Sequence, residues 1–292
     1  MKAKGMQYCS LVLGVLALST SAIFVKLAHA PSSVTAFYRL FFAMIILLPF
    51  LLTKRKYIQT LLSLSKKQWV IGIISGLFLS IHYVLWFESL QYTSVASSTV
   101  IVTLQPLFAF VGSYFLFKEK LNKGAILGCL MAMLGCFIIG WGDIQVSGQA
   151  LLGDLLAFAA AGVITIYFFI GEHMRTLLPV VPYSILGYSS SAFFLALYTL
   201  SQGISFIGYP ITTWSSFIAL AVISTILGQM VLNWLLKWLS TSIISMSILG
   251  ETVGTCFLAY LILGELISIQ QGTGIGITLG GLGLFLYYKT DK

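Results

Sequence analysis

The sequence predicts an all-α integral membrane protein, with ten transmembrane helices arranged as two inverted five-helix repeats. Two observations carry this prediction. The chain of 292 residues is 59% hydrophobic and only 8% charged, whereas a soluble domain carries about 25% charged residues. In addition, residues 92–140 reappear in blurred form at 238–286, an offset of 146 residues, which is half the chain. A water-soluble core cannot hide this much apolar surface, so we expect a lipid bilayer to surround the protein.

Ten apolar segments divide the chain, and each is about 20 residues long, which suffices to cross ~30 Å of hydrocarbon as a helix. Short polar loops separate them, and the longest cytoplasmic loop is expected at 54–67. The predicted spans are 8–28, 33–53, 69–90, 94–117, 123–141, 151–171, 182–202, 213–236, 241–263 and 270–288.

The internal repeat predicts two domains, 1–146 and 147–292, with five helices each. Identical pairs that survive the offset include Ser94/Ser240 and Gly135/Gly281. Because five is odd, the second copy is inverted relative to the first. Inverted repeats are typical of transporters whose substrate site lies between the halves near the bilayer midplane.

The basic residues predict the orientation of the helices. Of the 16 Lys and Arg residues, all but Lys26 and Arg39 fall in segments that lie on one side if both termini are cytoplasmic. This is the positive-inside pattern of a multi-pass protein of the cell (inner) membrane. The net charge of +8 is therefore a topology signal, and we expect no nucleic-acid partner.

The first span resembles a signal peptide, because Ala28-His29-Ala30 fits a cleavage site after a basic start and an apolar run. Cleavage would leave nine helices and destroy the repeat, so we expect this helix to be retained. The four cysteines all lie in apolar segments without metal-ligand spacing. We therefore expect neither a metal site nor a disulfide framework.

Small residues recur every four positions in the fifth and tenth spans, which lets another backbone approach closely. Two readings stay open: packing inside one chain, or a homodimer through helices 5 and 10. The stripe of the fifth span is Gly124, Gly128, Ala132, Cys136 and Gly140, and that of the tenth is Gly272, Gly276 and Gly280.

Glu251 is the first candidate for substrate binding or coupling. It lies near the middle of its span, and its repeat partner is Gln105, so both halves place a polar group at the midplane. A charge at this depth normally faces a cavity or a partner. Glu251 is a candidate proton carrier or a site for a substrate amine. The alternative is a structural carboxyl group satisfied by a neighbour such as Thr252.

Arg39 is the second candidate, since its planar guanidinium suits bidentate binding of a carboxylate. Together with Lys26 and Glu88 it falls toward the external side, so these three side chains are also candidates for an ion-pair network that closes an outer gate. The alternative is structural neutralisation, or snorkelling of Lys26 to the headgroups. Glu172, the repeat partner of Lys26, suggests a matching inner gate or simply a solvated helix end.

Pro106 is a further gating candidate, because a mid-helix proline removes a backbone hydrogen bond and clashes with the carbonyl of Val102. The predicted kink serves either substrate contact or helix shape.

Aromatic and neutral polar side chains complete the candidate site. His82 and Trp86 share one helix face, and such rings bind planar or apolar metabolites by stacking. Packing against lipid or a neighbouring helix is the alternative. The further candidates are Tyr38, Trp234, Gln229 and Asn233. Catalytic and nucleotide-binding motifs are absent from the sequence, so we expect neither an enzyme nor a cofactor.

Two stretches carry a family resemblance. Residues 82–120, HYVLWFESLQYTSVASSTVIVTLQPLFAFVGSYFLFKEK, resemble helices 3–4 of the EamA family in the drug/metabolite transporter superfamily, and residues 228–268 resemble the same region of its second repeat. The resemblance implies a central pathway lined by helices 1–4 and 6–9. It matches Glu119 and Glu265 to structural acids, and Pro106 to a mid-helix proline. Thr252 stands where the second repeat often has a proline, which argues against symmetric gating.

We therefore expect a secondary transporter of small metabolites that works by alternating access. Export of amino acids or related solutes is the first expectation. Import or exchange of nucleosides, sugars or other metabolites is the alternative within this class. A non-transporting membrane scaffold subunit is the alternative from another class.

Overall fold

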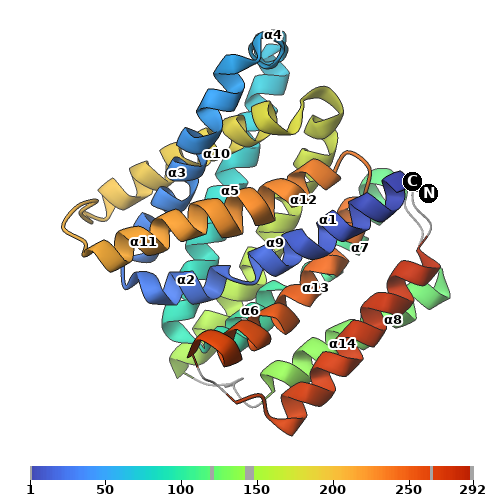
Figure 1. The fold of residues 1–292 in the computed structure, drawn as a ribbon. Coiled ribbons are helices and arrows are strands. Elements are labelled where there is room, and N and C mark those ends of the chain that lie inside the picture. Colours follow the sequence, from blue (N-terminus) through green and yellow to red (C-terminus); the bar gives the residue numbers. More distant parts are fainter. Residues whose placement is uncertain (1, 119–121, 142–147, 264–265, 290–292) are drawn as a thin grey trace.

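The computed structural model describes residues 2–118, 122–141, 148–263 and 266–289, and these are helical apart from short turns and loops (Figure 1). Glu119 and Glu265 lie outside the described residues. The helices are α1 (Lys2–Leu18), α2 (Ser21–Ala28), α3 (Ser32–Thr53), α4 (Arg55–Leu62), α5 (Lys66–Tyr92), α6 (Val95–Val102), α7 (Gln105–Phe117), α8 (Lys123–Gly140), α9 (Gly148–Leu177), α10 (Val180–Ser201), α11 (Ile211–Ala219), the π-helix η1 (Leu220–Gln229), α12 (Met230–Leu235), α13 (Thr241–Leu258), the π-helix η2 (Ala259–Leu263) and α14 (Ile269–Tyr288).

Nine continuous helical stretches among the described residues are long and apolar enough to cross a membrane, and they correspond to the first nine predicted spans. The tenth predicted span is α14, a helix of 20 residues. Two glutamines and several glycines make it less apolar than the others. The tenth transmembrane helix therefore stays a prediction.

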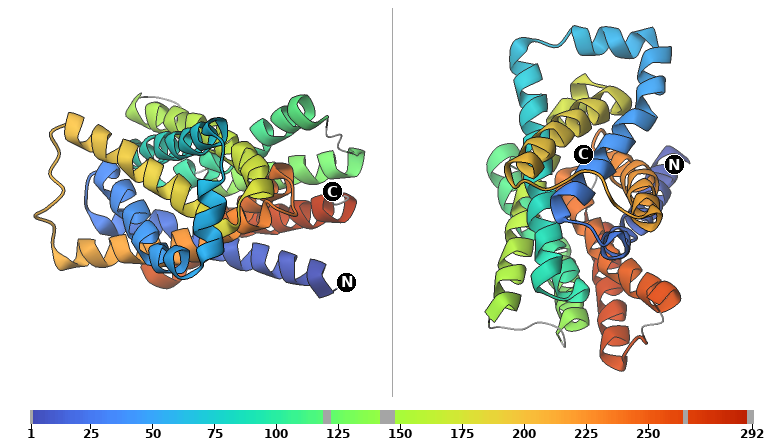
Figure 2. Two further views of the ribbon diagram at one scale, coloured as in Figure 1. Left: turned by 90° about the horizontal axis from the view of Figure 1, so that it is seen from above. Right: turned by 90° about the vertical axis from the view of Figure 1, so that its left-hand side faces the viewer.

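The segment predicted as the longest cytoplasmic loop contains the short helix α4. Tyr57, Ile58 and Leu61 pack against the core from this helix, whereas Lys56 is exposed. This amphipathic pattern explains why the segment folds as a helix at the edge of the bundle. Figure 2 shows α4 lying across the ends of α3 and α5, which run almost perpendicular to it. We call this end of the bundle the α4 end.

Three of the spanning helices are interrupted in their middle. The first span breaks at Ser19 and Thr20, between α1 and α2. The fourth breaks between α6 and α7, where Pro106 lies in the first turn of α7, so the interruption predicted at this proline is present. The eighth widens into the π-helix η1. Such irregular backbone is tolerated at membrane depth only where it faces protein or a cavity.

Helix α13 holds two of these interruptions in place. Thr255 donates from its hydroxyl to the carbonyl oxygen of Ser19 (3.2 Å), at the break between α1 and α2. The hydroxyls of Thr252 and Thr103 are hydrogen-bonded at 3.1 Å, at the break between α6 and α7. Because hydroxyls of one helix bond to residues at both breaks, the interrupted segments meet around α13.

Helices α8 and α14 form a tight pair at the periphery of the bundle (Figure 1). A Cβ atom added at Gly128 would come within 2.4 Å of the backbone nitrogen of Phe285, and one at Gly135 within 2.4 Å of that of Thr278. The small residues of the fifth span thus serve packing within one chain. In α14, Gly274 and Gly281 are the glycines that pack against α8. A Cβ atom added at Gly272, Gly276 or Gly280, the predicted stripe, would meet no atom within 4 Å.

Candidate functional site

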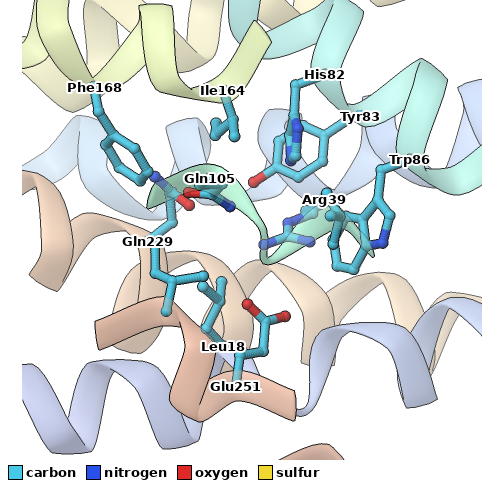
Figure 3. A pocket seen from close by; sticks show the side chains of 12 residues that line it. Leu18, Arg39, His82, Tyr83, Trp86, Gln105, Ile164, Phe168, Gln229 and Glu251 are labelled. Atoms are coloured by element: carbon cyan, nitrogen blue, oxygen red, sulfur yellow. The ribbon is translucent and has the colours of Figure 1, made fainter. Parts of the chain in front are cut away.

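A small cavity lies where the interrupted helices meet. Its volume is about 20 Å³, which is room for about one water molecule. All twelve of its lining residues are buried. Figure 3 shows its lining, which comes from α1, α3, α5, α6, α7, α9, η1 and α13: Leu18, Arg39, His82, Tyr83, Trp86, Val102, Gln105, Ile164, Phe168, Gln229, Ile248 and Glu251.

Arg39 on α3 is fully buried beside this cavity. Its Nε donates to Thr225 Oγ1 (2.8 Å) and its Nη1 donates to Ser21 Oγ (2.5 Å). The guanidinium carbon lies 4.5 Å from the ring centroid of Tyr83, a cation–π distance. Its Nη2 has no partner among the described residues. The charge is therefore held in one orientation with one nitrogen left to bind another group.

The helix interruptions supply both hydroxyl partners of Arg39. Ser21 is the first residue of α2, directly after the break in the first span. Thr225 lies inside η1 and donates to the carbonyl oxygen of Leu220, five residues earlier (2.9 Å). The widened π-turn thereby fixes the Thr225 hydroxyl that accepts from Arg39.

Glu251 on α13 is 3% exposed and faces the guanidinium of Arg39 (Figure 3). No nitrogen of Arg39 approaches a carboxylate oxygen of Glu251 within the 4 Å of a salt bridge, and Glu251 Oε1 has no hydrogen-bond partner in the part of the chain described. A guanidinium and a carboxyl group thus face one another without a direct ion pair. Burying an uncompensated carboxylate is costly, so this arrangement favours a group that binds between them.

Gln105 and Gln229 place two amides on the same cavity (Figure 3). Gln105 Oε1 and Gln229 Nε2 lack partners among the described residues. Gln105 and Glu251 are repeat partners, as are Tyr83 and Gln229. Each repeat therefore contributes polar groups from equivalent positions, and several of them can still accept or donate hydrogen bonds.

His82 and Trp86 form one wall of the cavity, with their ring centroids 5.8 Å apart and stacked. His82 Nδ1 lies 3.0 Å from the carbonyl oxygen of Ala160 on α9. Since a carbonyl only accepts, this nitrogen carries the proton. The contact fixes the imidazole ring against α9.

The structure places three predicted site residues away from the cavity: Tyr38, Asn233 and Trp234, the last of which lies at the α4 end of the bundle. Tyr38 donates from its hydroxyl to the carbonyl oxygen of Phe206 (2.9 Å) and packs against Trp214 and Phe217 in a separate aromatic cluster. Asn233 donates from Nδ2 to the hydroxyl of Tyr167 (2.7 Å). None of the three side chains lines the space beside Arg39 and Glu251.

The predicted outer ion-pair network is absent from the described residues. Lys26 Nζ donates to the carbonyl oxygen of Leu90 (3.1 Å), Arg39 bonds to hydroxyls, and Glu88 is half-buried without either cation. Lys26 and Arg39 are both on the predicted external half, but packing points them to different partners.

Sequence reasoning missed Ser21 and Thr225, the partners of Arg39, and left Tyr83 outside the chosen candidates. Serine and threonine are common in membrane helices, so no local signal distinguishes these two. Tyr83 had a signal, because its repeat partner is the polar Gln229.

Residues 5–141 and 151–287 each match the model of the EamA-like transporter family. The chain belongs to the EamA-like transporter family. The resemblance found in the sequence is thereby confirmed, and two EamA repeats cover most of the chain. Members of this family are transporters, and the apolar helices agree with a multi-pass membrane protein.

Individual relatives agree with this membership. YyaM, an uncharacterized transporter of Bacillus subtilis (strain 168), is 26% identical over 215 residues, which span 68% of this chain and 69% of YyaM. YhbE, an uncharacterized inner membrane transporter of Escherichia coli (strain K12), is 35% identical over 102 residues, 34% of this chain and 31% of YhbE. A solved crystal structure with 17% identity matches 98% of this EamA chain and 99% of its own, with a TM-score of 0.81, which shows the fold.

Proposed function

We propose that this EamA protein carries a small zwitterionic metabolite, an amino acid or a related solute, across the membrane. The opposition of Arg39 and Glu251 across this small cavity lined by buried residues carries the proposal. A substrate carboxylate would accept from the free Nη2 of Arg39, and a substrate amine would donate to Glu251 Oε1. A bound zwitterion would neutralise both buried charges at once.

The same geometry supports alternating access. A cavity of about 20 Å³ is too small for an amino acid, so the helices must separate to admit a solute. The interruptions at Ser19–Thr20 and at Pro106 are natural hinges, because they lack the continuous hydrogen bonding of a helix. Lys26 and Glu88 stay candidates for the outer gate.

We infer that both termini and the α4 end face the cytoplasm of a cell with an inner membrane, and that α14 is the tenth span. The lysine and arginine distribution supports this orientation. We propose export as the direction of transport, because a metabolite made inside the cell would move outward down its own concentration gradient. Coupling to protons through Glu251 is the energy source that the buried carboxyl group favours. A homodimer through α8 and α14, and the absence of enzymatic activity, stay predictions.

Counterflow in liposomes tests the proposal. The purified protein is reconstituted and assayed against amino acids, nucleosides and planar cations at two pH values. We expect saturable exchange of amino acids or similar zwitterions, and its loss in Glu251→Gln. Asp154→Asn is the matched control, since Asp154 is also a buried acid but accepts from Ser97 Oγ outside the cavity.

Each outcome decides between candidate functions. Exchange of nucleosides or planar cations alone would replace the zwitterion by a solute that stacks on His82 and Trp86. Exchange that survives in Glu251→Gln would remove Glu251 from the site. Folded protein without flux for any of these solutes, but with a stably bound partner protein, would favour the scaffold subunit.

A further inference from the structure

A second cavity lies at the α4 end of the bundle, apart from the central site. It has a volume of about 420 Å³ and runs between α4, the turn that joins α9 to α10, and the end of α12. We call it the cationic cleft and define it by Lys56, Arg175, Lys237, Trp234 and Trp238. No residue that lines the central cavity also lines the cationic cleft.

Positive charge dominates this cleft. Lys56 on α4 and Lys237 after α12 are exposed, and among its described lining residues there is no carboxylate. Arg175 is buried and held by carbonyl groups: its Nε donates to Asn233 O (2.9 Å) and its Nη1 to Leu178 O. Its charge is therefore fixed in place but not cancelled by an acid.

The N-terminus of helix α10 adds positive electrostatic potential to the cleft. This N-terminus opens onto the cleft at Pro179 and Val180, and no side chain caps it. The backbone N–H groups of Val180 and Val181 lack partners within the helix and attract anions, whereas Pro182 in the same turn has no N–H. Together with the three basic side chains, they make the cleft a site for a group with negative charge.

Part of the remaining wall of the cleft is apolar. Trp234 and Trp238 pack edge to face with their centroids 4.7 Å apart, and Lys237 Nζ lies 5.6 Å from the ring centroid of Trp238. Leu177 also lines the cleft and is 37% exposed. A ligand that fits both kinds of surface is amphipathic, with an anionic head and an apolar body.

The position of the cleft identifies the source of such a ligand. Helix α4 lies across the ends of α3 and α5 (Figure 2), and it is amphipathic, as helices at a membrane surface are. Leu52 and Leu62, at the ends of α3 and α4, are 60% and 74% exposed. They offer exposed apolar surface at the ends of the two helices.

We propose that the cationic cleft binds the phosphate headgroup of an anionic phospholipid, whose acyl chains lie along the apolar surface beside it. Basic pockets between transmembrane helices bind anionic headgroups in this way. Lys56 and Lys237 contact the phosphate, while Trp234 and Trp238 contact the glycerol and upper acyl region. The proposal rests on membrane insertion but not on the identity of the transported solute.

The test measures lipid binding to the full-length protein in a neutral detergent, by native mass spectrometry and by thermal unfolding. The probes are phosphatidylglycerol, phosphatidylcholine and inorganic phosphate. The cleft variant Lys56→Gln/Lys237→Gln is compared with Lys66→Gln/Lys67→Gln. This control removes the same two charges from exposed lysines at the start of α5 that do not line the cleft.

We expect phosphatidylglycerol to bind the wild-type protein more tightly than phosphatidylcholine. Its affinity should fall roughly tenfold to thirtyfold in the cleft variant, given the attraction of each lysine to an anionic headgroup, and stay unchanged in the control. Phosphatidylglycerol brominated in its acyl chains should quench tryptophan fluorescence, and Trp238→Phe should reduce that quenching.

Three outcomes would overturn the proposal. Equal losses in both double variants would mean attraction by net charge without a site. The ligand would be a soluble anion if inorganic phosphate alone raised the melting temperature, phosphatidylglycerol raised it no further, and the brominated lipid did not quench tryptophan fluorescence. Unchanged phosphatidylglycerol binding in the cleft variant would exclude the cleft. The assay needs no flux, so a failure of the proposed transport function is seen separately in liposomes.

Discussion

Lys26 and Glu172 occupy the same position in the two repeats, and each bonds to the junction between the third and fourth spans of its own repeat. Lys26 donates to the carbonyl oxygen of Leu90, in the last turn of α5. Glu172 Oε2 accepts from the backbone nitrogen of Thr241 (2.8 Å) and from its hydroxyl (2.7 Å), at the start of α13. A cation thus meets a helix C-terminus and an anion meets a helix N-terminus, as the helix dipole favours.

These two contacts lie at opposite ends of the bundle. Leu90 is at the far end of α5 from α4, whereas Glu172 is one turn from Arg175, which lines the cleft beside α4. Equivalent positions at opposite ends are what inverted repeats require. Lys26 and Glu172 carry opposite charges because Lys26 bonds to the C-terminal end of α5, whereas Glu172 bonds to the N-terminal end of α13.

Replacing Glu172 by glutamine should lower the stability of the protein by roughly 1 kcal/mol, because a charge-assisted bond to a helix N-terminus becomes a neutral one. Thermal unfolding in detergent micelles measures this change. The control is His173→Gln, at the exposed neighbouring residue. A melting temperature equal to that of the wild type would mean that Glu172 does not stabilise α13.

Replacing Arg39 by lysine should reduce counterflow at least tenfold while the protein stays folded. An ammonium group cannot donate at once to Ser21, to Thr225 and to a substrate carboxylate in the planar geometry of a guanidinium. Each lost charge-assisted hydrogen bond is worth about 1.5–3 kcal/mol. Arg55→Lys on α4 is the matched control. Full counterflow in Arg39→Lys would show that only the positive charge matters.

Replacing Thr225 by valine should weaken substrate binding by about tenfold, since Arg39 then loses the acceptor of its Nε and can reorient. Thr225→Ser keeps the hydroxyl and should bind substrate like the wild type. The measured quantity is the concentration for half-maximal counterflow. If valine and serine behave alike, the hydroxyl of Thr225 does not position Arg39.

Replacing Gly135 by valine should destabilise the pair of α8 and α14 by roughly 1–3 kcal/mol, because even a Cβ atom there meets the backbone of Thr278 at 2.4 Å. Gly276→Val faces open space and should leave the melting temperature in detergent nearly unchanged. A larger loss from Gly276→Val, together with a change in oligomeric mass, would instead reveal a dimer contact on the outer face of α14.

Much of the fold is predictable because its causes are local. A run of about 20 apolar residues forms a helix wherever water is excluded, since only internal hydrogen bonding satisfies the backbone there. The interruption at Pro106 follows from the missing amide hydrogen. The helix α4 was not predicted because three consecutive basic residues, Lys54, Arg55 and Lys56, precede its few apolar residues, and this charge is typical of a loop.

The sequence by itself determined the apolar spans, the repeat and the polar midplane positions Gln105 and Glu251, because hydropathy and an offset of 146 residues need no knowledge of packing. Only the tertiary structure decided which of these polar groups meet. Arg39 bonds to Ser21 and Thr225 instead of Lys26 or Glu88, and α14 turns Gly274 and Gly281 toward α8. These outcomes depend on the rotation of each helix about its axis, which is set by contacts between residues distant in the chain.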